Sequence, residues 1–305
     1  MPRLRFGSRL SIVCFVGLSF LLAWCVATPL WLGSGLREPS FTTVAALMMF
    51  TPTVAALAVY LLERRGSTFV RDTGIWPVRR PGRFFASVVL AFLVPIALVV
   101  QAPFVGTWLG IFPGDLQNFT LLNFVAGTQG PMHYLADQAR LIAIAGMANA
   151  LLAVGEEVGW RGWLWPRLAR SGKLMAILLS GVIWGIWHAP LILLGYNYPF
   201  APGWGVAAMC GVCVILGAFL GWIRSWSNSV WPAALAHGVF NASVGLTSLF
   251  TTLGASIDPT ESSIMGWTGW IAPGAVMALI LFGIAMRARF QSSISTIRTN
   301  REVQL

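Results

Sequence analysis

Long apolar runs, separated by short polar segments, dominate the pattern of the chain. A helix that crosses a hydrocarbon core of ~30 Å needs about twenty consecutive apolar residues. We therefore expect an all-α polytopic membrane protein, in which 1–290 form a single helical domain and 291–305 form a polar C-terminal tail. Eight runs have the required length, and the transmembrane helices that they predict lie near 10–32, 42–62, 84–106, 141–164, 174–195, 204–223, 229–252 and 266–286.

Composition and charge support a membrane location. Of the 305 residues, 57% are hydrophobic and only 10% are charged, which is more apolar than a soluble domain of this length. The formal net charge of +10 would suggest nucleic-acid binding in a soluble protein. Here the basic residues, apart from Arg37 and Arg140, occupy every second polar segment, so we expect the bilayer as partner and no nucleic acid. By the positive-inside rule, this alternation predicts an even number of crossings with both termini in the cytoplasm. The basic residues concentrate in 1–9, 64–83, 167–173, at Arg224 and in 287–289.

The first apolar run also has the position of a secretory signal peptide. It extends from about Leu10 to Leu32, whereas the apolar core of a signal peptide has about 7–15 residues. We therefore expect the run to be retained as the first transmembrane helix.

Charged side chains interrupt the fourth apolar run. The stretch AVGEEVGWRGWLWPRL places Glu156, Glu157 and Arg161 beside residues that are otherwise apolar. Ionisable residues inside a membrane are costly and by default mark function. Glu157 and Arg161 are four residues apart, so on a helix they lie on one face and can pair. Glu156 lies about 100° further around the helix, so its carboxyl group remains available to a cavity.

Two histidines lie in other apolar runs. His188 belongs to GVIWGIWHAP, two residues before Pro190, which is expected to disrupt the helix there. His237 and Asn241 are four residues apart in AALAHGVFN, so their side chains share one face of the seventh helix. A carboxylate, two imidazoles and an amide are enough groups for hydrolytic chemistry.

Two hydrolytic schemes fit these groups. In the first, Glu156 is the general base for a water, His188 holds that water, and His237 and Asn241 donate to the oxyanion. In the second, Glu156, His188 and His237 bind a divalent metal such as zinc, which activates the water. The usual zinc-protease sequence HExxH is absent from the chain. We favour the scheme without a metal or other cofactor and leave the second open.

These residues resemble three motifs of one known family. EEVGWRG, which begins at Glu156, is similar to the motif EExxxR of the CAAX prenyl protease and bacteriocin-processing group of intramembrane proteases, also called CPBP or Abi proteins. Trp184 to His188 resembles the motif FxxxH, with Trp in place of Phe, and His237 to Asn241 resembles HxxxN. The resemblance extends over about 150–245, and the expected catalytic core is about 141–252.

The resemblance implies a conical catalytic cavity between the helices. It implies that Glu156 is the catalytic base, that His188 is its partner on the water, and that His237 and Asn241 stand on the oxyanion side. Glu157 and Arg161 correspond to a supporting pair. Tryptophans cluster around the motifs, and we expect two of them, Trp160 and Trp184, to contact substrate.

The sequence therefore predicts an intramembrane endopeptidase. Its substrate would be a membrane-associated peptide or protein, either of the prenylated CAAX type or a leader peptide, and its location a prokaryotic plasma membrane. Two other classes of membrane protein would have the same buried polar residues. One is a non-proteolytic membrane scaffold or bacteriocin immunity protein with the same fold, and the other is a small-solute or metal transporter.

Overall fold

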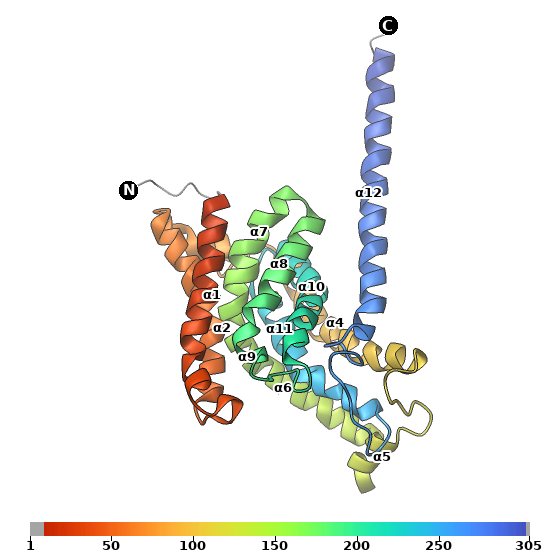
Figure 1. Cartoon of the computed structure of the whole chain (residues 1–305). Coiled ribbons are helices and arrows are strands. Elements are labelled where there is room, and N and C mark those ends of the chain that lie inside the picture. Colours follow the sequence, from red (N-terminus) through yellow and green to blue (C-terminus); the bar gives the residue numbers. More distant parts are fainter. Residues whose placement is uncertain (1–8, 303–305) are drawn as a thin grey trace.

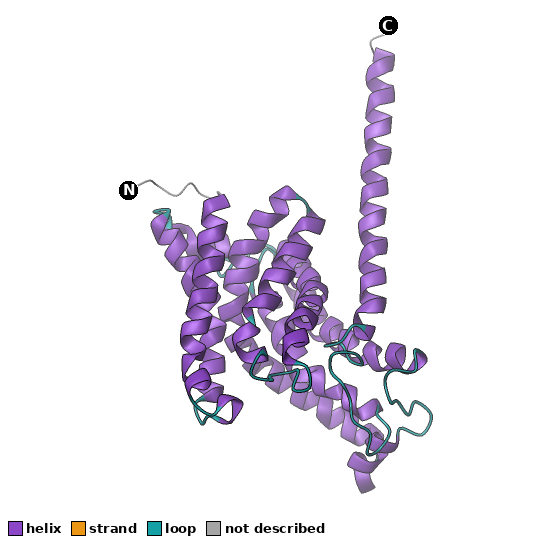
Figure 2. Ribbon diagram, viewed as in Figure 1, coloured by secondary structure: helices purple, strands orange, loops and turns teal. Residues whose placement is uncertain are grey.

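The computed structural model describes residues 9–302, with side chains described as far as residue 287. These residues form helices joined by loops, and the described part of the chain contains no β-strand (Figure 2). The helices are α1 (Arg9–Leu32), α2 (Phe41–Leu62), α3 (Phe69–Thr73), α4 (Pro81–Trp108), α5 (Thr120–Ala126), α6 (Pro131–Glu157), the π-helical segment Val158–Leu164, α7 (Trp165–Leu168), α8 (Lys173–Trp187), α9 (Ala189–Ile192), α10 (Pro202–Ser227), α11 (Trp231–Ser243) with a 3₁₀ continuation Val244–Phe250, and α12 (Thr268–Glu302).

The fold is that of an integral, polytopic, all-α membrane protein, as predicted. Among the described residues, seven helical stretches are long and apolar enough to cross a membrane. Each of the eight predicted runs coincides with a helix, but the fifth corresponds to α8, which has only 15 residues. At 1.5 Å per residue, α8 is about 22 Å long and is shorter than a hydrocarbon core.

The helices pack as a bundle from which α12 projects (Figure 1), and α12 contacts α4 and α10 of this bundle. At one side of the bundle α1 lies against α2, while α11 packs on both α6 and α4, and α10 packs on α8. The beginning of α1 and the C-terminal end of α12 lie at the same end of the molecule (Figure 1). Helix α12 continues through the polar residues after 290 as far as Glu302.

Glycines allow the central helices to approach one another closely. A Cβ at Gly159 would overlap Pro52 of α2, and one at Gly185 in α8 would overlap Cys210 of α10. Packing through small residues is the common way in which helices associate in membranes, where burial of apolar surface gives little driving force. The close approach brings the polar residues of α6, α8 and α11 to one place in the bundle.

Two predicted spans differ from the observed helices. The fourth run, predicted at 141–164, lies within a longer helical stretch, Pro131–Ser171, whose π-helical part begins directly after Glu157. The fifth run ends as a helix at Trp187 and restarts at Ala189, with Pro190 in the first turn of α9. The predicted disruption near Pro190 is therefore present, and His188 lies at the junction of the two helices.

Candidate active site

The two glutamates lie where α6 changes from α-helical to π-helical geometry. Glu156 and Glu157 are the last residues of α6, and Arg161 lies within the π-helical segment. Short π-helical segments inside α-helices occur frequently at functional sites. All three side chains are buried, with at most 2% of their surface exposed. Such buried charges require partners close by.

Glu157 is the centre of a buried cluster of charged and polar groups. Its Oε1 accepts hydrogen bonds from Arg161 Nη1 and from His237 Nδ1, each at 3.0 Å. The pairing with Arg161 follows from the predicted helical spacing. The contact with His237, from α11, was not anticipated by the sequence. Because a carboxylate oxygen only accepts, His237 donates its Nδ1–H, which turns Nε2 away from Glu157.

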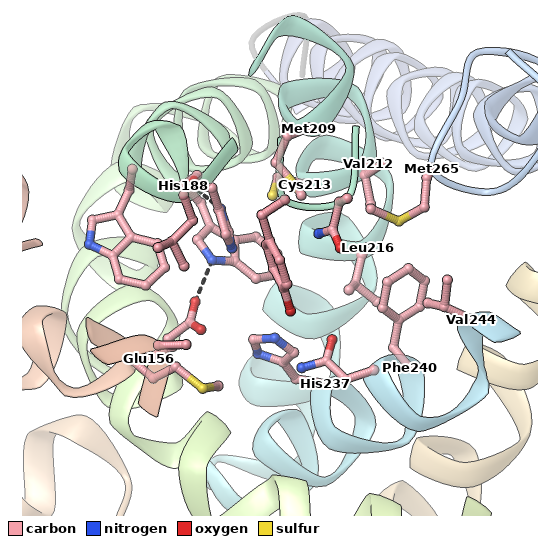
Figure 3. Close-up of a pocket in the computed structure, with 18 of the residues that line it drawn as sticks. Glu156, His188, Met209, Val212, Cys213, Leu216, His237, Phe240, Val244 and Met265 are labelled. Carbon is pink, nitrogen blue, oxygen red and sulfur yellow. Dashed lines mark hydrogen bonds between the residues drawn. The ribbon is translucent and has the colours of Figure 1, made fainter. Parts of the chain in front are cut away.

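Glu156 has a separate partner. Its Oε2 accepts a hydrogen bond of 2.6 Å from Nε1 of Trp184 in α8 (Figure 3). Among the described residues, Oε1 of Glu156 makes no hydrogen bond. One oxygen of this carboxyl group is thus held by the protein, and the other remains available to a molecule in the adjacent cavity.

His188 also depends on Trp184. Nδ1 of His188 lies 2.9 Å from the backbone oxygen of Trp184. A carbonyl oxygen can only accept, so Nδ1 carries the proton. In the neutral ring Nε2 then has a free lone pair, which can accept a hydrogen bond from water. His188 is half-buried, at the break between α8 and α9.

The four predicted catalytic residues line one cavity of about 380 Å³. Glu156, His188 and His237 surround this space together with Cys213 of α10 (Figure 3). Asn241, one turn after His237 on α11, belongs to the same wall. A water molecule occupies about 30 Å³ in the liquid, so the cavity has room for water and for a short stretch of substrate.

Of the two tryptophans predicted to contact substrate, only Trp184 lines the cavity. Trp160 is buried between the rings of Phe15 and Trp187, with ring centroids at 5.5 and 5.9 Å. The expectation that Trp160 contacts substrate therefore does not hold, since its ring faces the core of the bundle. The π-helical geometry after Glu157 changes the angular register that an α-helix would give.

The cavity also contains residues that the sequence analysis did not single out. Asn149 of α6 and Asn197 of the loop before α10 contribute amides to its wall. The sequence contains one signal for Asn149, because a polar amide side chain stands out within the fourth apolar run. Methionines form part of the apolar wall, namely Met48, Met49, Met209 and Met265. The wall thus combines amide groups with flexible apolar side chains.

The grouping of the side chains suggested for a metal can be compared with a metal-binding set. Among the described residues, no three His, Cys, Asp or Glu side chains are grouped so that they could hold a metal ion. Nδ1 of His237 is engaged by Glu157, and Oε2 of Glu156 is engaged by Trp184. These hydrogen bonds leave Oε1 of Glu156 and Nε2 of His237 without a partner among the described residues.

Comparison with known proteins agrees with the motifs. Residues 138–243 match the family model described as Type II CAAX prenyl endopeptidase Rce1-like. A stretch of 51 residues is 39% identical to the protein named CAAX prenyl protease 2 from Methanococcus maripaludis. This match spans 16% of the chain and 19% of the relative, so the chain spans about a fifth of that protein. The matched family segment includes all three motifs, and the predicted resemblance is confirmed.

Proposed function

We propose that this chain is an intramembrane endopeptidase. Its residues 138–243 match a model of the CAAX prenyl protease and bacteriocin-processing family. It hydrolyses a peptide bond in a membrane-associated substrate. One observation carries the proposal: Glu156, His188, His237 and Asn241, from three separate parts of the bundle, line the same cavity. A carboxylate, two imidazoles and an amide around one cavity supply a base, a water ligand and oxyanion donors.

Glu156 and His188 activate the water. Oε1 of Glu156 takes one proton from a water in the cavity. Nε2 of His188 accepts a hydrogen bond from the other O–H of that water and so orients it. The hydroxide attacks the carbonyl carbon of the scissile peptide bond. General-base catalysis of this kind contributes about 100-fold to 10,000-fold in rate.

His237 and Asn241 stabilise the negative charge that develops on the carbonyl oxygen. Asn241 donates from its amide, and His237 donates from Nε2 when that nitrogen carries a proton, while its Nδ1–H is held by the Glu157 carboxylate. The tetrahedral intermediate collapses when the C–N bond breaks. The proton held by Glu156 passes to the leaving nitrogen, and the products are a carboxylate and an amine.

The cavity wall supports a peptide with an apolar portion as substrate. Asn149 and Asn197 offer amide donors and acceptors suited to a peptide backbone, beside the methionine-rich part of the wall. The substrate is of the prenylated CAAX type or is a leader peptide. We further propose that the chain resides in a prokaryotic plasma membrane with both termini in the cytoplasm, on the basis of its basic segments.

Mass spectrometry of candidate membrane peptides tests this function. Purified protein in lipid nanodiscs is incubated with a panel of prenylated and leader-type peptides, alongside the variants Glu156→Gln and Glu63→Gln. Glu63 is a matched control because it is a glutamate at the end of α2 that lies outside the cavity. Its Oε1 accepts a hydrogen bond from the hydroxyl group of Ser11. We expect wild type and Glu63→Gln to cleave, and Glu156→Gln to be at least about 100-fold slower.

The same measurement separates the other classes. A scaffold or immunity protein gives no cleavage product and keeps its cellular phenotype when Glu156 is replaced by Gln. A transporter gives solute flux into vesicles without a product. Equal cleavage by wild type and Glu156→Gln would remove Glu156 from the mechanism.

A further inference from the structure

A second cavity, of about 290 Å³, lies outside the catalytic site. Among the described residues, none lines both cavities. The wall of the second cavity combines the end of α2 and the segment around α3 with the π-helical segment, α7 and the 3₁₀ turn after it. We call it the arginine pocket, because its seven lining residues include Arg65, Arg167 and Arg170. The proposed mechanism uses none of these side chains.

The arginine pocket carries an excess of positive charge. Asp72 is the only carboxylate among its described lining residues, and it also pairs with Arg71 at 3.2 Å. From α10, Nη2 of Arg224 donates to the backbone oxygen of Asp72 at 3.3 Å. Glu63 is a second carboxylate, which acts electrostatically on Arg167. The pocket and these neighbours thus hold five guanidinium groups against two carboxylates, which favours an anion as ligand.

Arg167 is held in place within the protein. Its side chain is buried, and its Nη1 donates to the backbone oxygen of Trp163 at 2.8 Å. The guanidinium carbon lies 3.9 Å from the centroid of the Trp163 ring and 5.4 Å from that of Tyr60. A guanidinium that is already ordered loses little conformational freedom when a ligand arrives. Arg167 therefore supplies a fixed positive charge at the buried side of the pocket.

Arg65 and Arg170 form the open side of the pocket. Arg170 is exposed, and the side chain of Arg65 is 36% exposed. Arg65 pairs with Asp72 at 3.3 Å, but a largely solvent-exposed pair of this kind is weak and competes poorly with another anion. Because the two arginines belong to different walls, they reach a ligand from different directions. This arrangement suits the tetrahedral oxygens of a phosphate group, which guanidinium groups bind through parallel N–H···O bonds, better than a planar carboxylate.

The pocket lies at the depth of lipid head groups. Its first wall is at the end of α2, between Tyr60 in the last turn and Arg65 three residues after Leu62. Its second wall is at the end of the helical stretch Pro131–Ser171, which includes Arg167. Both stretches are long and apolar enough to cross a membrane, so their ends reach the head-group region. In the proposed orientation this end faces the cytoplasmic leaflet, whose anionic lipids attract basic residues.

Apolar surface suited to acyl chains continues from the pocket. Leu61 and Leu62 directly follow Tyr60 on α2, and each is 60% exposed. Val70 of α3, two residues before Asp72, is 47% exposed. A phospholipid has its acyl chains next to its phosphate group and covers such side chains, whereas a soluble phosphate leaves them uncovered. The surroundings of the pocket therefore favour a lipid.

We propose that the arginine pocket binds the phosphate group of an anionic membrane phospholipid. Arg65 and Arg170 donate to the phosphate oxygens, and Arg167 supplies the fixed positive charge behind them. The bound lipid bridges the end of α2 and the end of the π-helical stretch. This site is separate from the proposed catalytic function, and its test needs no cleavage. A soluble phosphate offers the same chemistry, so the experiment distinguishes the two sources.

Native mass spectrometry of the full chain counts the molecules that bind. The protein in a neutral detergent is titrated with phosphatidylglycerol at about 0.15 M ionic strength, where exposed charges more than about 8 Å apart are largely screened. Separate titrations use phosphatidylcholine, which has the phosphate but no net charge, and oleate, which has a carboxylate. Inorganic phosphate is added in competition with phosphatidylglycerol. We expect one phosphatidylglycerol to bind more tightly than either other lipid, and inorganic phosphate not to displace it.

Two pairs of substitutions locate the site. Arg65→Gln with Arg170→Gln removes the two open guanidinium groups, and we expect the affinity for phosphatidylglycerol to fall about 30-fold. Arg79→Gln with Arg83→Gln is the matched control, because it removes the same charge from exposed residues of the same basic segment outside the pocket. We expect the control to change the affinity less than about threefold. If the first pair is unstable, Arg170→Gln alone should lower the affinity about fivefold.

Four results would overturn all or part of the inference. Equal weakening by both pairs, or an unchanged affinity of Arg170→Gln, would remove the pocket as the site, since binding would then follow total charge. Binding of oleate as tight as that of phosphatidylglycerol would overturn the choice of a phosphate group. Displacement of the lipid by inorganic phosphate would keep a phosphate site and overturn the lipid as its occupant. Absence of phosphatidylglycerol binding to the wild type would overturn the inference and leave the proposed catalytic function untouched.

Discussion

Replacement of Glu157 by Gln removes a buried charge and keeps the shape of the side chain. Glu157 is fully buried, and its Oε1 receives both Arg161 Nη1 and His237 Nδ1. Gln retains an oxygen that accepts from His237, but it leaves the guanidinium of Arg161 without its paired counter-charge. The variant therefore isolates the electrostatic part of this buried cluster.

The magnitude follows from the surroundings of Arg161. Its Nε and Nη2 atoms are buried and have no hydrogen-bond partner among the described residues, so within the described part of the chain Glu157 is the one carboxylate that pairs with it. Breaking a buried pair by removing one partner costs about 3–5 kcal/mol. The guanidinium keeps its contact with the Trp184 ring in the variant, so we take the lower end of this range. We therefore expect a loss near 3 kcal/mol, about a 150-fold fall in the folded-to-unfolded ratio.

Unfolding in mixed micelles measures this loss. The protein is titrated with SDS in a mild detergent and followed by far-UV circular dichroism, for wild type, Glu157→Gln and the double variant Glu157→Gln with Arg161→Met. The double variant removes both charges, so we expect it to recover to within about 1 kcal/mol of wild type. A single variant destabilised by less than about 1 kcal/mol, or a double variant as unstable as the single one, would refute the electrostatic reasoning.

Three further predictions concern packing, catalysis and metal dependence. Gly159→Ala introduces a Cβ that overlaps Pro52, so thermal unfolding should show a loss of about 1–3 kcal/mol, whereas Gly17→Ala, with no atom within 4 Å of its new Cβ, should show none; equal effects would contradict the packing argument. Asn241→Leu removes an oxyanion donor and should lower kcat about 100-fold to 1,000-fold in a peptide assay, and an unchanged kcat would take Asn241 out of the reaction. Cleavage should persist after dialysis against a chelator; loss of cleavage with recovery on addition of zinc would favour the metal scheme.

The helices were largely predictable from the sequence, because the thickness of a bilayer fixes the length of an apolar run. The exception is the fifth run, which remains apolar beyond the point where α8 ends. Pro190 signals a disruption there, but hydropathy does not register that the helix stops at Trp187 and restarts at Ala189. Apolar content measures the preference for lipid, and a break that is buried within the bundle does not change it.

The site was predictable where it depends on spacing along one helix. The Glu157–Arg161 pair follows from a separation of four residues. The contact between Glu157 and His237 joins residues 80 apart and depends on how α11 packs against α6. Likewise, spacing does not distinguish Trp184, which donates to Glu156, from Trp160, which faces the core. These contacts arise from tertiary packing, for which a single sequence contains no direct signal.

The central claim is that Glu156 activates a water for attack on a peptide bond in the cavity. The most direct measurement is the rate at which heavy oxygen from labelled water enters the new carboxyl group of a cleaved peptide, followed by mass spectrometry. Wild type should incorporate one heavy oxygen per cleavage, and Glu156→Gln should form labelled product at least about 100-fold more slowly while remaining folded. Labelled product formed at the wild-type rate by Glu156→Gln would contradict the claim.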